Sequence, residues 1–177
     1  MVKIDLSYLL KVFYLLLPGY FANMSPAFSN KINFLNYPVD FNKTLFGKRI
    51  LGKNKTFRGI FFAILIAIVI SYLQSLLDLE INLISYDTFI WIGFLLGFGA
   101  MFGDLIKSFF KRQLNIPPGK RFLPFDQIDH VIGALIFLSI DYNINIKIFI
   151  VGLIITFPLH LIINYVTYKL KLRDTYW

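Results

Sequence analysis

The chain has 177 residues, of which 57% are hydrophobic and only 16% are charged. Soluble domains are typically about 45–50% apolar and about 25% charged, so this composition, with a mean hydropathy of +0.66, indicates an integral membrane protein. We expect a single domain, residues 1–177. The absence of cysteine excludes disulfides, thiolate zinc sites and a cysteine nucleophile. The net charge of +8 indicates an anionic partner: phospholipid headgroups, nucleotides or nucleic acid.

Apolar segments follow one another along the chain, and a helix needs roughly 20 residues to cross a bilayer. The segments are 6–28, 60–77, 88–110, 128–140 and 146–168. The first contains Pro18-Gly19, where we expect a kink or a break that neighbouring helices cover. The fourth is short, and forms either a re-entrant piece or a span that includes residues 124–129. The pattern predicts an all-α integral membrane protein with about five transmembrane helices.

Basic residues gather in alternate connections between these segments. Residues 31–58 contain seven Lys or Arg, residues 107–121 contain five and residues 169–173 contain three, whereas residues 78–87 and 141–147 together contain four acids and one lysine. The positive-inside rule places the basic connections in the cytoplasm. We therefore expect a multi-pass protein of the cell membrane with its N-terminus outside and its C-terminus in the cytoplasm. Lys3 and Lys11 argue weakly against this orientation.

The third segment ends in GDLIKSFFKR, residues 103–112. Asp104, Lys107, Ser108 and Lys111 stand at i, i+3, i+4 and i+7, which places them on one face of a helix. One interpretation is a local salt bridge with lysines that reach the membrane edge. However, an acid at the centre of a span costs roughly 2.5–3.5 kcal/mol. Close packing of this helix is also expected from the glycines that precede the acid: Gly93, Gly97, Gly99 and Gly103.

The fourth segment begins with PFDQIDHVIG, residues 124–133, in which Asp126 and Asp129 are also three residues apart. One interpretation makes Asp126 a helix N-cap and Asp129 a favourable acid in the first turn. The functional interpretation adds Asp104, so that carboxylates from two adjacent helices meet on the cytoplasmic side. Such hard oxygen ligands suit Mg²⁺, which usually binds one or two carboxylates plus substrate phosphates. His130 is better explained as a packed side chain than as a ligand.

The connection before the second segment contains GKRILGKNKTFRG, residues 47–59. It has the spacing of a P-loop, but Asn54 stands where Ser or Thr should hold Mg²⁺ and no predicted strand precedes it, so we reject that motif. What remains is a basic cluster that enters a helix N-terminus, where backbone N–H groups and the helix dipole favour phosphate. The alternative is an ordinary basic flank that binds lipid headgroups loosely.

These three stretches fall on the same predicted side of the membrane, as anionic substrates, a divalent metal and phosphate chemistry would require. Nucleic acid fits poorly because the bases are confined to membrane-proximal loops, and no Ser/His/Asp motif is present. A small transporter or channel for an anion or a metal is the main alternative, although the second segment has almost no polar residues to line a path. A non-catalytic binder of anionic lipids would leave the aspartates unexplained.

The same stretches resemble the archaeal CDP-archaeol synthase family, membrane cytidylyltransferases related to the CDP-diacylglycerol synthases. The resemblance covers nearly the whole chain and is most specific in GKNKTFRG (52–59), GDLIKSFFKR (103–112) and PPGKRFLPFDQID (117–129). The broader family usually has Lys-Asp before its proline region and Asp-Arg before the final Asp. This chain has Arg-Phe-Leu-Pro and then Asp126-Gln127 instead, so the match is to the archaeal branch.

The resemblance implies transfer of CMP from CTP to an unsaturated archaeal diether lipid phosphate (digeranylgeranylglyceryl phosphate), giving a CDP-archaeol-type lipid and pyrophosphate in membrane phospholipid biosynthesis. It also implies Mg²⁺. We assign Asp104, Asp126 and Asp129 to metal binding and to catalysis, together with Lys111. The residues expected to bind nucleotide, phosphate or metal-bound water are Lys53, Asn54, Lys55, Thr56, Arg58, Lys107, Ser108, Arg112 and Gln127. We expect a groove for prenyl-type chains at the small residues of the third segment and around Pro18-Gly19.

Overall fold

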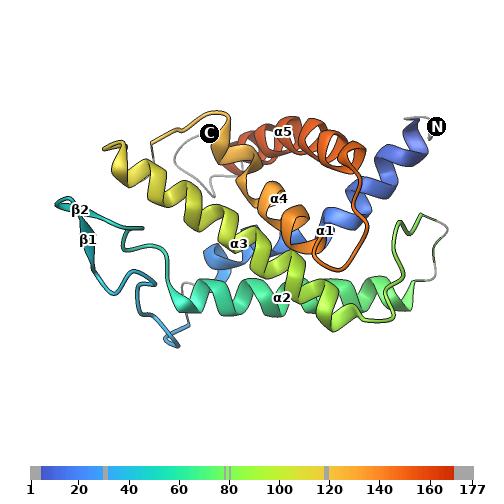
Figure 1. Ribbon diagram of the computed structural model, residues 1–177, viewed down its shortest axis with the longest axis horizontal. Helices are drawn as coiled ribbons and strands as arrows, with labels where there is room; N and C mark the ends of the chain where they lie inside the picture. The colour runs from blue at the N-terminus through green and yellow to red at the C-terminus, as the bar shows by residue number, and fades with distance from the viewer. Residues whose placement is uncertain (1–4, 30–31, 78, 80, 118–119, 170–177) are drawn as a thin grey trace.

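The structure, a computed structural model, describes residues 5–29, 32–77, 79, 81–117 and 120–169. In this part of the chain, five helices form a bundle and a short hairpin lies in the first long connection (Figure 1). The helices are α1 (Leu6–Ser29), α2 (Phe57–Leu76), α3 (Phe89–Gln113), α4 (Phe125–Leu138) and α5 (Ile146–Lys169), and the strands are β1 (Thr44–Leu45) and β2 (Lys48–Arg49). The predicted helical fold is confirmed, with a two-stranded hairpin that no sequence pattern predicted.

The helices differ in their ability to cross a membrane. Among the described residues, α2, α3 and α5 are long and apolar enough by length and composition. With 14 residues, α4 is about 21 Å long at 1.5 Å per residue, which is less than the hydrocarbon thickness of about 30 Å. Helix α1 has 24 residues and continues through Pro18 and Pro26. Of the kink or break expected at Pro18-Gly19, the break is wrong, because the helix stays continuous there. The kink stays a prediction.

Successive helices run in opposite directions, so the connections alternate between the two ends of the bundle (Figure 1). The α1–α2 and α3–α4 connections meet at the end that carries the hairpin, and the other two lie near the start of α1. Two of the three basic stretches that were predicted to share one side therefore lie at one end of the bundle. Of the third, residues 169–173, only Lys169 is described. The charged residues of this pattern that lie outside the described residues are Lys3, Lys31, Asp78, Glu80, Lys171 and Arg173.

The glycines of α3 allow it to pack closely against two neighbours at once. A Cβ on Gly93 would lie 2.5 Å from the Cα of Ile68 in α2, and a Cβ on Gly103 would collide with the backbone carbonyl of Asp129 in α4. Small residues at such contacts are typical of helix packing in membranes, so the predicted close packing is confirmed. The contact at Gly103 also brings the acid that follows it, Asp104, beside Asp129.

The outer faces of α2 and α5 are covered by large apolar side chains. On α2, the exposed side chains include Phe61, Leu65, Val69, Tyr72 and Leu76. Soluble monomers rarely expose a contiguous apolar surface of this kind, and a lipid environment removes its cost. These faces agree with a membrane-embedded protein, and they leave the polar chemistry to the end that carries the hairpin.

Candidate active site

The three predicted acids, Asp104, Asp126 and Asp129, form one aspartate cluster between α3 and α4. Their carboxylates surround the ammonium of Lys107, whose Nζ lies 3.1 Å from Asp104 Oδ1, 3.5 Å from Asp126 Oδ1 and 2.9 Å from Asp129 Oδ2. Gln127, on the same helix turn as two of the acids, is also buried. The structure therefore brings together acids that the sequence places in two separate stretches.

Two further lysines compensate the outer oxygens of the cluster. Lys55 Nζ, from the connection before α2, lies 2.5 Å from Asp104 Oδ2. Lys111 Nζ lies 3.0 and 3.2 Å from the carboxylate oxygens of Asp126 and donates to the backbone oxygen of Lys120 at 2.5 Å. Three acids thus face three lysines, so the charges balance. Removing one member of a buried ion pair is costly, typically about 3–5 kcal/mol, because the remaining charge is left without a partner.

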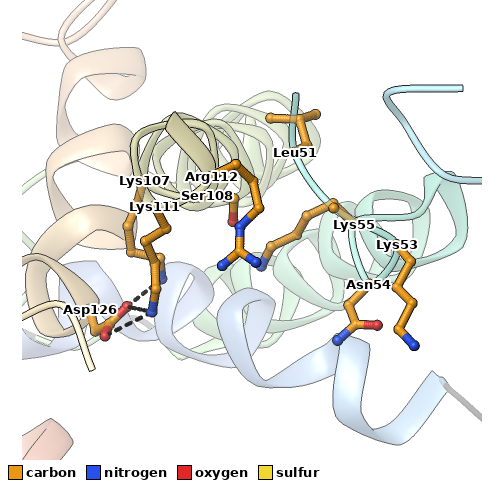
Figure 2. Close-up of a pocket in the computed structure, with 10 residues that line it drawn as sticks. Leu51, Lys53, Asn54, Lys55, Lys107, Ser108, Lys111, Arg112 and Asp126 are labelled. Atoms are coloured by element: carbon orange, nitrogen blue, oxygen red, sulfur yellow. Dashed lines mark hydrogen bonds and ion pairs between the residues drawn. The ribbon is translucent and has the colours of Figure 1, made fainter. Parts of the chain in front are cut away.

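A basic hollow opens beside this cluster and has a volume of about 160 Å³ (Figure 2). It is lined by Leu51, Gly52, Lys53, Asn54, Lys55, Lys107, Ser108, Lys111, Arg112 and Asp126. Three of its five cations, Lys55, Lys107 and Lys111, are paired with the aspartate cluster. The excess positive charge of the hollow therefore comes from Lys53 and Arg112. Gly52 turns the chain at the rim with a φ of +107°, a conformation that favours glycine. A small hollow with this excess of positive charge suits a polyanion such as a phosphate chain.

A second space, the polar hollow, also adjoins the cluster and has a volume of about 340 Å³. Besides charged residues it is lined by Asn23 of α1, Gln127 of α4, and His160 and Asn164 of α5. Asn164 Nδ2 lies 3.1 Å from His160 Nδ1. Gln127 is 4% exposed, and its Oε1 has no hydrogen-bond partner among the described residues. Only Gln127 was predicted, although polar residues inside apolar helices are themselves a signal of function.

An apolar groove of about 390 Å³ runs along the outside of α3 and α4. It is lined by Phe102, Gly103, Ile106, Lys107, Phe110, Phe122, Phe125, Asp129, Ile132, Gly133, Ile136 and Phe137. The groove expected around Pro18-Gly19 is wrong, because Gly19 packs against α4, where an added Cβ would lie 3.4 Å from Ala134 Cβ. Lys107 lines the groove and both hollows, so all three spaces meet at this residue.

Two of the predicted binding residues lie apart from these spaces. Thr56 is the N-cap of α2 and accepts a hydrogen bond from the N–H of Gly59 at 3.2 Å. Arg58 is buried, and its Nη1 donates to the backbone oxygen of Ile32 at 2.7 Å. Thr56 thus caps the helix that follows Lys53, Asn54 and Lys55, and Arg58 ties the start of α2 to Ile32. The alternative that Asp126 is an N-cap is wrong, since the N-cap of α4 is Pro124.

The loop also depends on Asp40, which the sequence did not single out. Asp40 is 5% exposed and accepts hydrogen bonds from Arg49 Nη2 at 2.7 Å and from the N–H groups of Leu51 at 3.1 Å and Gly52 at 2.9 Å. Burial raises the pKa of its carboxyl, but the hydrogen bonds from Arg49 and the backbone outweigh burial and hold the pKa well below its usual range. The available signal was its position as the only acid in a long basic connection.

No group of three acids or histidines in the described part of the chain stands ready to hold a metal ion. The ammonium of Lys107 lies within 3.5 Å of all three carboxylates of the aspartate cluster. His130 is buried, with Nδ1 3.4 Å from Asp129 Oδ1 and its ring packed against Tyr20, as expected for a packed side chain.

Comparisons with known proteins agree with this arrangement. The CarS-like model of the CDP-archaeol synthase family matches residues 4–177. The chain is similar to the CDP-archaeol synthase of Pyrobaculum islandicum, with 34% identity over 96% of this chain and 99% of that protein. It is similar to the CDP-archaeol synthase of Archaeoglobus fulgidus, with 37% identity over 97% of this chain and 99% of that protein.

A solved structure of an intramembrane enzyme for archaeal membrane lipid biosynthesis has the same fold. It aligns with a TM-score of 0.74 and 26% identity, over 88% of this chain and 94% of that one. The enzyme interpretation is thereby confirmed, and the transporter alternative is set aside. The chain belongs to the CDP-archaeol synthase family.

Proposed function

We propose that this chain transfers CMP from CTP to an archaeal diether lipid phosphate, giving a CDP-lipid and pyrophosphate. The family match over residues 4–177 supports this reaction. The structural observation that supports this reaction is that the basic hollow, the polar hollow and the apolar groove meet at Lys107. A nucleotide triphosphate and a lipid with long apolar chains have to be brought together at a junction of this kind.

The reaction requires no covalent intermediate with the enzyme. An oxygen of the lipid phosphate attacks the α-phosphorus of CTP and forms a new P–O bond. The bond from the α-phosphorus to the bridging oxygen breaks on the opposite side, and pyrophosphate leaves with that electron pair. Catalysis then consists of positioning two anions against each other and neutralising their charge.

The residues of the basic hollow are suited to the triphosphate. Lys53, Lys55 and Arg112 provide cations from two elements, while Asn54 and Ser108 provide neutral hydrogen bonds. The cationic excess there offsets the charge that develops on the leaving pyrophosphate.

The apolar groove is suited to a lipid chain, because phenylalanine and isoleucine side chains cover its walls. Its polar end is formed by Lys107 and Asp129. A chain in this groove would place its phosphate at Lys107, next to the triphosphate, with Lys111 neighbouring both.

The aspartate cluster offers the hard oxygen donors that Mg²⁺ prefers, and its carboxylates lie within 3.5 Å of one positive charge, the ammonium of Lys107. Asp104, Asp126 and Asp129 would hold the ion, and Lys111 would hold Asp126 in place. When bound, Mg²⁺ supplies further neutralisation of the phosphate oxygens.

We also propose five membrane crossings, with the N-terminus outside and the end that carries the hairpin in the cytoplasm. The antiparallel order of the helices supports this topology (Figure 1). The natural chain has no cysteine, so single cysteines can report the orientation. In spheroplasts, an impermeant maleimide should label Asn143→Cys at the opposite end and should leave Phe46→Cys in the hairpin unlabelled. The reverse pattern would invert the topology.

The function is tested with purified protein, labelled CTP, Mg²⁺ and the unsaturated diether phosphate, with Asp126→Asn beside the parent. We expect a labelled lipid from the parent and little from the variant. Equal product from both would keep the reaction but remove Asp126 from its centre. A folded parent that makes no product, either from the diether phosphate or from diacyl phosphatidic acid, would overturn the proposed function.

A further inference from the structure

The ammonium of Lys107 occupies the position that the proposed metal would need. It contacts all three carboxylates of the aspartate cluster, at 3.1, 3.5 and 2.9 Å, and its side chain is 14% exposed. Lys55 and Lys111 hold the outer oxygens of Asp104 and Asp126. Each acid of the cluster therefore has a lysine partner. For Asp129 that partner is Lys107 alone, with His130 beside it.

A divalent cation and this ammonium exclude each other. Mg²⁺ binds carboxylate oxygens at about 2.0–2.1 Å, so it would require the space that Nζ fills, and like charges repel at this range. The same lysines, Lys55, Lys107 and Lys111, also line the basic hollow. A triphosphate bound there would attract them, and a lysine has a flexible four-carbon stem that allows its ammonium to turn toward a phosphate.

Movement of Lys107 toward phosphate would leave the buried Asp129 without its lysine partner, which is unfavourable. A divalent cation restores the balance. Binding of the nucleotide therefore favours binding of the metal, and by linkage the metal favours the nucleotide to the same degree.

We propose that Lys107 is a positioning residue. In the free enzyme its ammonium lies between the three carboxylates of the aspartate cluster, and when nucleotide binds it moves away so that the metal can bind there. This inference rests on the proposed function, since it concerns the metal and the nucleotide of that reaction. It adds that the free enzyme binds a divalent cation weakly, and that Lys107 is the reason.

The test measures Mn²⁺ affinity by electron paramagnetic resonance on full-length protein in detergent, without nucleotide. Lys107→Met should bind Mn²⁺ at least about tenfold more tightly than the parent, because a like charge at the site has been removed. Lys107→Arg keeps the charge and should stay close to the parent. A merely structural role for Lys107 would weaken or abolish metal binding in the Met variant.

The matched control is Lys53→Met. Lys53 lines the same basic hollow but forms no ion pair within the described ranges of the chain. This variant loses the same charge and should weaken CTP binding, yet its Mn²⁺ affinity without nucleotide should stay within about twofold of the parent. An equal gain in both Met variants would show a general effect of net charge and would overturn the proposal.

The second measurement is CTP affinity by equilibrium dialysis in EDTA and in excess Mg²⁺. In the parent, Mg²⁺ should strengthen CTP binding, and in Lys107→Met this gain should shrink. Should Lys107→Met fail to fold, Lys107→Gln takes its place in both measurements. If the parent makes CDP-lipid but the Lys107 variant binds Mn²⁺ with unchanged affinity, the proposed role of Lys107 is rejected and the proposed function stands. A parent that binds Mn²⁺ and CTP but makes no CDP-lipid rejects the proposed function instead.

Discussion

Buried carboxylates occur in two regions at the same end of this molecule, and they are compensated in different ways. Asp40 is held by a guanidinium and by backbone N–H groups of the same loop. The aspartate cluster is compensated by three lysine ammoniums, two from α3 and one from the connection before α2, and those lysines also line the basic hollow. Backbone groups cannot leave their acceptor without unfolding the loop, whereas a lysine can exchange one anion for another. Asp40 therefore stabilises the loop that carries the site, whereas the lysines of the aspartate cluster are available to bind a ligand.

The largest expected effect is on kcat, when one aspartate in each region is replaced by asparagine. Asp129→Asn removes a carboxylate of the cluster and should lower kcat by about 10²–10³-fold, the usual cost of losing one charge-stabilising group. Asp40→Asn should lower kcat far less. Steady-state kinetics with CTP and the lipid phosphate would measure both. Equal losses of kcat in the two variants would contradict the view that Asp40 stabilises the loop whereas Asp129 takes part in binding.

The next effect tests whether helix packing places the cluster. Gly103→Ala would force α3 away from the backbone of α4 at Asp129, and overpacking of this kind typically costs about 1–3 kcal/mol. We expect a lower melting temperature in detergent together with lost activity. Gly59→Ala is the matched control, since its Cβ would lie 3.5 Å from Pro26 Cβ, an ordinary contact. A Gly103→Ala variant that melts and reacts like this control would show that the close approach is not required.

Helix periodicity was sufficient to predict the face formed by Asp104, Lys107, Ser108 and Lys111, because side chains three and four residues apart lie on the same side of any α-helix. The pairing of Lys55 with Asp104 could not be predicted in this way. These residues are 49 positions apart in the chain, and their contact depends on how the loop before α2 folds back over α3.

Asp40 shows a different limit of sequence reasoning. Its main partners are backbone N–H groups, which every residue except proline possesses, so no motif of side chains marks it. His160 and Asn164 were missed for another reason. They are four residues apart on one face of an apolar helix, but only the packing of α5 beside α4 brings that face to the polar hollow.

A smaller effect is expected for the stability of the loop around Asp40. Losing a hydrogen-bonded charge in Asp40→Asn should cost about 1.5–3 kcal/mol at neutral pH. Because the folded pKa of Asp40 is lowered, its contribution is complete above the ordinary carboxyl pKa of about 3.9. It is lost progressively as the pH falls from there toward the folded pKa. Melting temperatures of parent and variant should therefore converge on acidification, and a constant difference down to strongly acidic pH would contradict this assignment.

The smallest expected effect is on a KM value, and it tests whether the apolar groove and the basic hollow bind different substrates. Ile136 lines the apolar groove and is half exposed, so Ile136→Trp should fill part of the groove and leave the basic hollow unchanged. We expect the KM for the lipid phosphate to rise by about tenfold, the lower end of the range for a small change in an apolar pocket. The KM for CTP should stay constant, because the Asp40 loop and its lysines are not in contact with the groove. Ile154→Trp, on an exposed face of α5 outside the groove, is the control. A rise in both KM values, or the same rise in the control, would mean that the groove is not the separate binding site for the lipid chain.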